Sequence, residues 1–219
     1  FEIIEPLIEK YIGSLVSLDR EDAFVDHGIR RTQGKEYIEY SEDDPKKATV
    51  IRFYNKKFNY KFREMIKSRL LFNILDKLLF DEVREKSNLV YSISASKNFD
   101  QKIPIELISF YTYFNSDPKN IDIIKEKIDI EINKIKNKDF DLQIFKDQKL
   151  ALKNNYKTSG ETNSFWLGVL TDAKQNGLNI ERISYREAML NSITVNDIVK
   201  LANYYFDENY LRSVSLVAE

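Results

Sequence analysis

The sequence predicts a two-layer α+β fold, in which one mixed or antiparallel sheet carries helices on one of its faces. Alternating segments rich in β-branched and aromatic residues predict strands at 48–54, 89–98, 103–115 and 210–217. Segments with apolar residues every three or four positions predict helices between these strands. No linker rich in Gly, Ser or Pro interrupts the chain, so residues 1–219 are expected to form a single domain.

The first segment, residues 1–15, predicts an amphipathic helix that Gly13 closes in a left-handed conformation. Its apolar face consists of Ile4, Leu7, Ile8, Tyr11 and Ile12. Because the chain begins with Phe1 rather than Met, we expect it to be a fragment of a longer polypeptide. The polar stretch 17–47 predicts an irregular connection with one short strand at 36–40.

The middle of the chain predicts one long helix and a strand pair. The basic and aromatic segment 56–63 is expected to be a solvated lead-in to a helix over 61–86. That helix buries a stripe that includes Ile66, Leu70, Ile74 and Leu78. The strands at 89–98 and 103–115 are expected to be antiparallel, with a turn near Asp100.

The remainder predicts mainly helices. Asp117 and Pro118 favour a helix start, and that helix runs to residue 136. Further helices are expected at 142–156, 162–176 and 180–190. Thr194 and Asp197 form a predicted capping box that opens a helix ending at Phe206.

The two central strands predict a sheet with unlike faces, because successive side chains of a strand point to opposite sides. One face is rich in serine and tyrosine and carries Ser92, Ser94, Ser96, Ser109, Tyr111, Tyr113 and Asn115. The other face is apolar and carries Leu89, Tyr91, Ile93, Ala95, Ile108, Phe110 and Phe114. We expect helices on the apolar face and water on the other. Alternation therefore places Tyr91, at the start of its strand, on the apolar side.

Residue counts exclude several kinds of site. The chain has no cysteine, which excludes disulfides, thiolate nucleophiles and Cys-ligated zinc. It has one histidine, His27, and we expect this to be a surface residue rather than a metal ligand or a base. A catalytic zinc usually takes two or three histidines, so no metal is expected in this chain. A net charge of −1 and the absence of a long apolar run favour neither nucleic acid nor a membrane as partner.

The most specific stretch is LLFDEVREKSNLVYSISAS, residues 78–96, which reads as a helix end, a polar turn and a strand. It resembles the C-terminal, non-catalytic domain of the insulinase (pitrilysin, M16) family of zinc peptidases, of the bacterial zinc-protease-like type. There a long helix ends in the pattern l..lRE..gLvYsi.a. PLIEKYIGSL (6–15), FNSDP (114–118) and NSITVNDIVKLA (191–202) follow the order of the family, although Val16 stands where Pro is usual.

The resemblance implies the LuxS/MPP-like metallohydrolase fold and a role as one half of a clam-shell peptidase. The chain lacks the His-x-x-Glu-His motif of the catalytic half, so zinc would be held by a partner domain, in cis or in trans. By the same resemblance Arg84 would orient a peptide substrate through its carbonyl or carboxylate groups. Tyr91 would donate its hydroxyl to the oxyanion that forms as zinc-bound water attacks. The serine- and tyrosine-rich sheet face would line the chamber that holds the peptide.

Other interpretations of these residues stay open at the level of sequence. Arg84 could pair locally with Asp81 or Glu82, and Tyr91 could be an ordinary core aromatic. A different class of function, a non-peptidase scaffold or binding module of the same fold, needs neither residue. A hydrolase built on His27 is disfavoured because no nucleophile elbow is present. The compartment is not given, and a bacterial periplasm or cytoplasm would fit equally.

Overall fold

The computed structural model describes residues 2–16, 25–30, 35–42, 47–99 and 105–218. The chain divides into two compact units, residues 1–30 and 31–219, which are described separately. The expectation that residues 1–219 form a single domain stays a prediction. The expected turn near Asp100 and the first residues of the strand predicted at 103–115 lie outside the described residues.

The first unit contains the predicted helix, as α1 (Glu5–Ile8) and a π-helical turn η1 (Glu9–Gly13). Its apolar side chains are exposed, from 45% for Ile8 to 64% for Tyr11. The left-handed conformation expected of Gly13 is wrong, because the positive-φ glycines among the described residues are Gly28 and Gly177. Gly13 is the last residue of η1, and the next residue, Ser14, has right-handed backbone angles.

The second unit is built on a mixed five-stranded sheet with the order β1-β5-β2-β4-β3. The strands are β1 (Glu36–Glu42), β2 (Ala48–Lys57), β3 (Val90–Phe99), β4 (Leu107–Ser116) and β5 (Leu211–Ala218). β1 pairs with β5 in parallel, and the other three pairings are antiparallel. The antiparallel pairing expected of the two central strands is confirmed.

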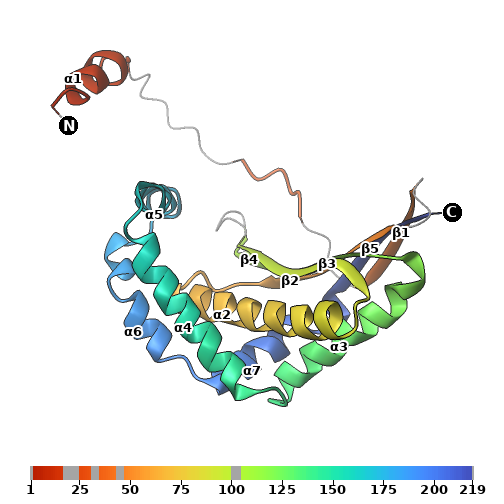
Figure 1. Ribbon diagram of the computed structural model, residues 1–219. Helices are drawn as coiled ribbons and strands as arrows, with labels where there is room; N and C mark the ends of the chain where they lie inside the picture. The colour runs from red at the N-terminus through yellow and green to blue at the C-terminus, as the bar shows by residue number, and fades with distance from the viewer. Residues whose placement is uncertain (1, 17–24, 31–34, 43–46, 100–104, 219) are drawn as a thin grey trace. The chain divides into compact units, whose positions relative to one another are not determined.

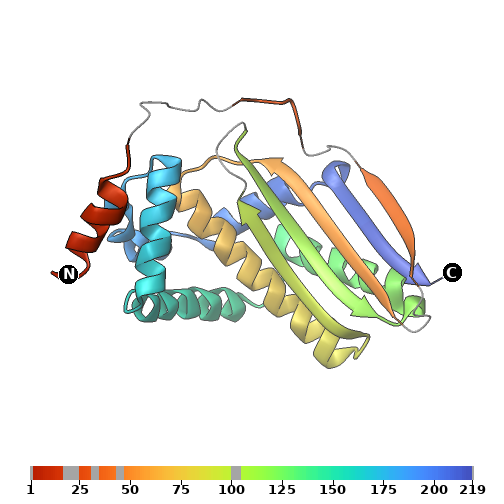
Figure 2. The same cartoon turned by 90° about the horizontal axis from the view of Figure 1, so that it is seen from above.

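Helices cover one face of this sheet (Figures 1 and 2), as the α+β prediction expects. They are α2 (Phe62–Leu79) with its π-helical continuation η2 (Phe80–Lys86), α3 (Ile121–Lys136) and α7 (Val195–Tyr205). α4 (Leu142–Ser159), α5 (Asn163–Asn176), the 3₁₀ turn η4 (Ile180–Ile183) and α6 (Arg186–Asn191) pack around the start of α2. The 3₁₀ turns η3 (Pro118–Asn120) and η5 (Glu208–Tyr210) precede α3 and β5.

The core lies between the sheet and the helices. Fully buried side chains come from α2 (Leu70, Leu71, Ile74, Leu75), β4 (Ile108, Phe114) and α3 (Ile124, Ile135). The predicted helix ends are confirmed where a side chain caps them. Thr194 and Asp197 form the full capping box of α7, and Asp117 caps η3 by accepting from the Lys119 backbone N–H.

Two cations on the helix-facing side of β2 tie the layers together. Arg52 is 3% exposed and forms a two-pronged pair with Asp129 of α3, at 2.7 and 3.0 Å. Lys56 is 8% exposed and lies 3.0 Å from the Asp207 carboxylate. The expectation of a solvated lead-in at 56–63 is therefore wrong at Lys56 and at Phe58, which is 4% exposed. β2 continues to Lys57 because these side chains have partners in the interior.

Candidate functional site

Arg84 lies on η2, where the long helix widens from α-helical to π-helical turns. Val83 is fully buried and fixes this turn against the core, whereas Arg84 is exposed. The Arg84 guanidinium lies over the Phe80 ring, 5.1 Å from its centroid. π-helical turns are rare and are often found at functional sites.

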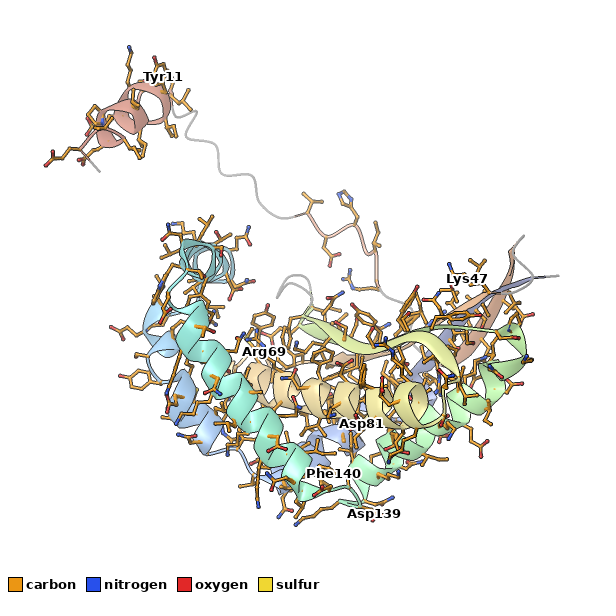
Figure 3. All side chains as sticks on the ribbon, viewed as in Figure 1. Tyr11, Lys47, Arg69, Asp81, Asp139 and Phe140 are labelled. Atoms are coloured by element: carbon orange, nitrogen blue, oxygen red, sulfur yellow. The ribbon has the colours of Figure 1, made fainter. Side chains whose placement is uncertain are left out.

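The neighbouring carboxylates are engaged by lysines instead of Arg84. Asp81, labelled in Figure 3, accepts from Lys77 at 2.7 Å, and Glu82 pairs with Lys86. Within the described parts of the chain, no carboxylate forms an ion pair with Arg84. Local charge pairing therefore does not account for Arg84.

A tight turn joins Arg84 to the strand that carries Tyr91. Asn88 adopts a left-handed conformation with φ 50°, which asparagine tolerates better than most residues. The Asn88 N–H donates to the Arg84 carbonyl at 3.1 Å, and the Leu89 N–H donates to the Val83 carbonyl at 3.3 Å. These bonds fix the short connection between η2 and β3.

Tyr91 is the extra residue of a β-bulge. Val90 pairs with Ser116 and Ser92 pairs with the next residue, Asn115, so Tyr91 has no partner on β4. Tyr91 is 65% exposed and Ser92 beside it is also exposed, whereas Val90 and Ile93, which flank this pair, are 7% and 9% exposed. Strict alternation, which placed Tyr91 on the apolar side, is wrong here because the bulge turns its side chain outward.

Polar side chains continue from Tyr91 across the sheet face. Ser92 donates to the Asn115 side-chain oxygen at 3.0 Å, and Asn115 donates to the Thr49 hydroxyl at 2.7 Å. The pKa of Lys119 is raised first by its hydrogen bond and charge pairing with Asp117, and Tyr91 adds to this.

The sheet face away from the helices is less polar than the sequence suggests. β3 and β4 present Ser94, Tyr111 and Tyr113 there, as expected. β2 and β5 add apolar side chains in register with them, since Ile51 pairs with both Tyr113 and Val214. Ile51 is 38% exposed. This face therefore combines aromatic rings, hydroxyls and aliphatic groups.

The described residues contain no group of three or more His, Cys, Asp or Glu side chains that could hold a metal ion. His27 is exposed in the first unit. The described residues therefore do not supply the side chains that a catalytic zinc ion requires. Among the described helices, none is both long enough and apolar enough to cross a membrane.

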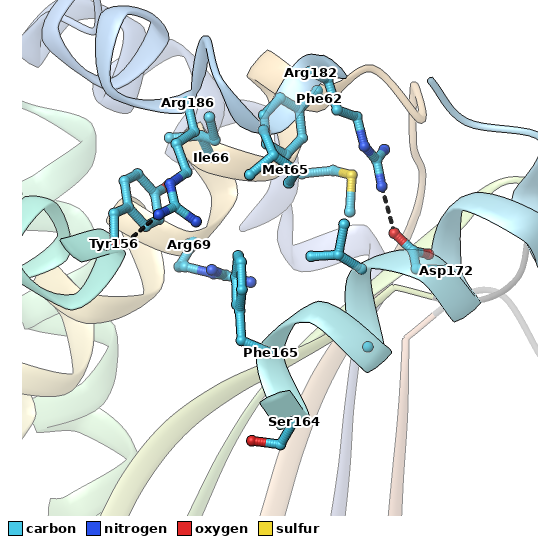
Figure 4. A pocket seen from close by; sticks show the side chains of 13 residues that line it. Phe62, Met65, Ile66, Arg69, Tyr156, Ser164, Phe165, Asp172, Arg182 and Arg186 are labelled. Atoms are coloured by element: carbon cyan, nitrogen blue, oxygen red, sulfur yellow. Dashed lines mark hydrogen bonds and ion pairs between the residues drawn. The ribbon is translucent and has the colours of Figure 1, made fainter. Parts of the chain in front are cut away.

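A second feature, which the sequence analysis missed, is a pocket at the other end of α2 (Figure 4). It has a volume of about 330 Å³ and is lined by Arg69 of α2, Arg182 of η4 and Arg186 of α6, among other residues. Fifteen residues of helix separate Arg69 from Arg84, about 22 Å at 1.5 Å per residue. The spacing of Arg182 and Arg186, one helical turn apart, was the available signal in the sequence.

The sequence model of a protein family, the peptidase M16 inactive domain, matches residues 2–152, which is more than half of the chain. The chain belongs to the peptidase M16 family. The motif at 78–96 lies within the matched part, so the prediction made from it is confirmed. No curated protein sequence matches the chain.

Solved structures of proteases share the fold. The periplasmic protease PqqL of Escherichia coli superposes with a TM-score of 0.79 at 16% identity, over 100% of this chain and 24% of that protein. A protease from Helicobacter pylori gives 0.78 at 17% identity, over 98% and 52%. A peptidase M16 inactive domain from Pseudomonas fluorescens gives 0.70 at 15%, over 84% and 43%. The chain thus spans about a quarter to a half of these proteins.

Proposed function

We propose that this M16 domain is the metal-free half of a zinc metalloendopeptidase, which closes over a zinc-bearing half and binds the peptide substrate. The supporting observation is that Arg84 and Tyr91 lie on two backbone irregularities, a π-helical turn and a β-bulge, with both side chains exposed. Such irregularities are frequent beside active sites because they redirect a side chain.

Arg84 is suited to hold a peptide. Its guanidinium carbon lies 5.1 Å from the centroid of the Phe80 ring, a cation–π contact that helps to hold the group in place. Since Lys77 and Lys86 engage the nearby carboxylates, the guanidinium N–H groups are available to a substrate carbonyl or carboxylate.

Tyr91 is suited to assist the reaction. Its exposed phenol can donate to an oxyanion that develops on the peptide carbonyl in the closed enzyme. Zinc, held by the other half, supplies the activation of water.

The test is reconstitution with the zinc-bearing half, whether that half is a separate chain or part of the same polypeptide. Combining the halves should yield peptide hydrolysis that a chelator stops. Removing one oxyanion donor typically lowers kcat by about 100- to 1,000-fold, and we expect Tyr91→Phe to fall in this range. Arg84→Ala should mainly raise KM, because it removes substrate binding.

Tyr185→Phe serves as a matched control, since Tyr185 is 58% exposed and lies near α6, away from the proposed site. Full activity of both Arg84→Ala and Tyr91→Phe would remove the assigned roles. A complex that forms with the zinc-bearing half but never cleaves peptides would favour the alternative, a non-peptidase scaffold of the same fold.

A further inference from the structure

We propose that the pocket bounded by α2, α4, α5, η4 and α6 binds a carboxylate carried on an apolar body, and that its ligand is the C-terminal end of a peptide. The choice of a peptide rests on the proposed function. The carboxylate chemistry does not, because it follows from the pocket alone. The pocket lies about 22 Å along α2 from Arg84, so it is separate from the site proposed above.

The walls of the pocket are mainly apolar. α2 contributes Phe62, Met65 and Ile66, and α5 contributes Phe165 and Val169. The volume of about 330 Å³ is at the lower end of the range for small-molecule sites and is enough for one large side chain and a terminal carboxylate. An apolar last residue of a peptide would therefore be desolvated between the two helices.

The charged part of the lining has three guanidinium groups and one carboxylate. Arg182 pairs with Asp172 at 2.5 Å, on one side of the pocket in Figure 4. Arg186 lies on the other side, between the rings of Tyr156 and Phe165 at 5.1 and 4.9 Å, and donates to the Tyr156 carbonyl. After the Arg182–Asp172 pair is subtracted, two positive charges remain.

These two charges are not balanced by nearby side chains. Glu187, the residue after Arg186, is paired with Lys153 at 2.6 Å. Arg69 is exposed and forms no ion pair among the residues that the structure describes. The Arg182 Nε and the Arg186 Nη1 are buried without a hydrogen-bond acceptor. Buried N–H groups normally have an acceptor, so a carboxylate bound beside either arginine would remove an electrostatic cost.

A further cation increases the local positive potential. Lys97 lies on the other side of Arg69, in an adjoining hollow that shares Arg69. Burial and then the charge of Arg69 lower the pKa of Lys97 to about 8. Arg69 and Lys97 line this hollow without a carboxylate in its lining, an arrangement that favours an anionic ligand.

The binding experiment uses the 219-residue chain and the fluorescence of Trp166, its single tryptophan, whose ring lies 5.3 Å from that of Phe165. Three probes are titrated: an N-acetylated hexapeptide ending in Phe with a free carboxylate, the same peptide with a C-terminal amide, and 3-phenylpropionate. We expect the free acid to bind at least tenfold more tightly than the amide, and raised salt to weaken its binding.

Two variants test the location. Arg69→Gln removes the free cation, and Gly168→Phe fills the pocket, since a Cβ at Gly168 meets no atom within 4 Å. Each should weaken binding of the free acid at least tenfold. The matched controls are Arg63→Gln, which removes an arginine of α2 outside the pocket, and Gly168→Ala, which adds one methyl group. Both controls should bind as the parent chain does, and thermal melts check that every variant folds.

Equal binding of the acid and the amide, or unchanged binding in both pocket variants, would overturn the inference. Binding of 3-phenylpropionate without binding of the peptide would support the carboxylate chemistry and assign the pocket to small organic acids. Because no zinc-bearing half is present, failure here leaves the roles of Arg84 and Tyr91 untouched.

Discussion

The stability of Tyr91→Ala tests whether Tyr91 is an exposed residue or a core aromatic. Tyr91 is 65% exposed, so only about a third of its surface is buried. Full burial of a large apolar side chain stabilises a fold by about 1.5–3 kcal/mol, which gives about 0.5–1 kcal/mol for Tyr91. Tyr54 is the matched control, because it is 4% exposed and packs edge-on against Phe206 at 5.3 Å. Tyr54→Ala should cost about 3–5 kcal/mol, as is typical of buried aromatics.

The assay is urea unfolding of the isolated chain, followed by circular dichroism, with the free energy of unfolding extrapolated to water. A small loss for Tyr91→Ala and a large loss for Tyr54→Ala would agree with the outward direction set by the bulge. If Tyr91→Ala lowers the free energy of unfolding as much as Tyr54→Ala does, Tyr91 is a structural aromatic. That result would refute the reasoning that assigns Tyr91 a role in the proposed site.

Two further predictions concern the charges that the fold buries. Asp129→Asn should destabilise the chain by about 1–3 kcal/mol, because the buried Arg52 guanidinium loses its charged partner. The double variant Arg52→Met with Asp129→Asn should recover most of that loss. A double variant no more stable than Asp129→Asn alone would contradict this expectation. Burial, and then the charge of Arg69, lower the pKa of Lys97 from 10.5 to about 8 in the folded chain. Between these pH values the unfolded chain binds a proton at Lys97 that the folded chain does not. The free energy of unfolding therefore rises with pH across this range. Lys97→Met should therefore be more stable than the parent at pH 7, by up to about 3 kcal/mol, and this advantage should shrink towards pH 10, as thermal melts across that range can measure.

The sequence predicted the regular elements well because each carries a local pattern. The apolar stripe of α2, the capping box at Thr194 and the alternation of β4 all depend on residues a few positions apart. Their boundaries shifted where tertiary partners intervened. β2 extends to Lys57 because Lys56 forms an ion pair with Asp207, which is distant in the sequence.

The candidate site was predicted in its residues but not in its geometry. The motif at 78–96 pointed to Arg84 and Tyr91, but periodicity assumes one fixed repeat along each element. A π-helical turn and a β-bulge each change that repeat locally, so the direction of both side chains depends on the backbone. The pocket was missed for another reason, since its arginines are contributed by α2, η4 and α6, which meet only in the folded chain.

The two irregularities also bear on the roles proposed for Arg84 and Tyr91. π-helical turns are rare, and the bulge leaves Tyr91 unpaired in its ladder. Tyr91 is mostly exposed, and Arg84 has no carboxylate partner among the described residues. Backbone features that cost stability and present exposed polar side chains are typical of sites that act on something outside the chain. Because the described residues hold no zinc ligand set, we propose that these side chains act on the peptide of a zinc-bearing half.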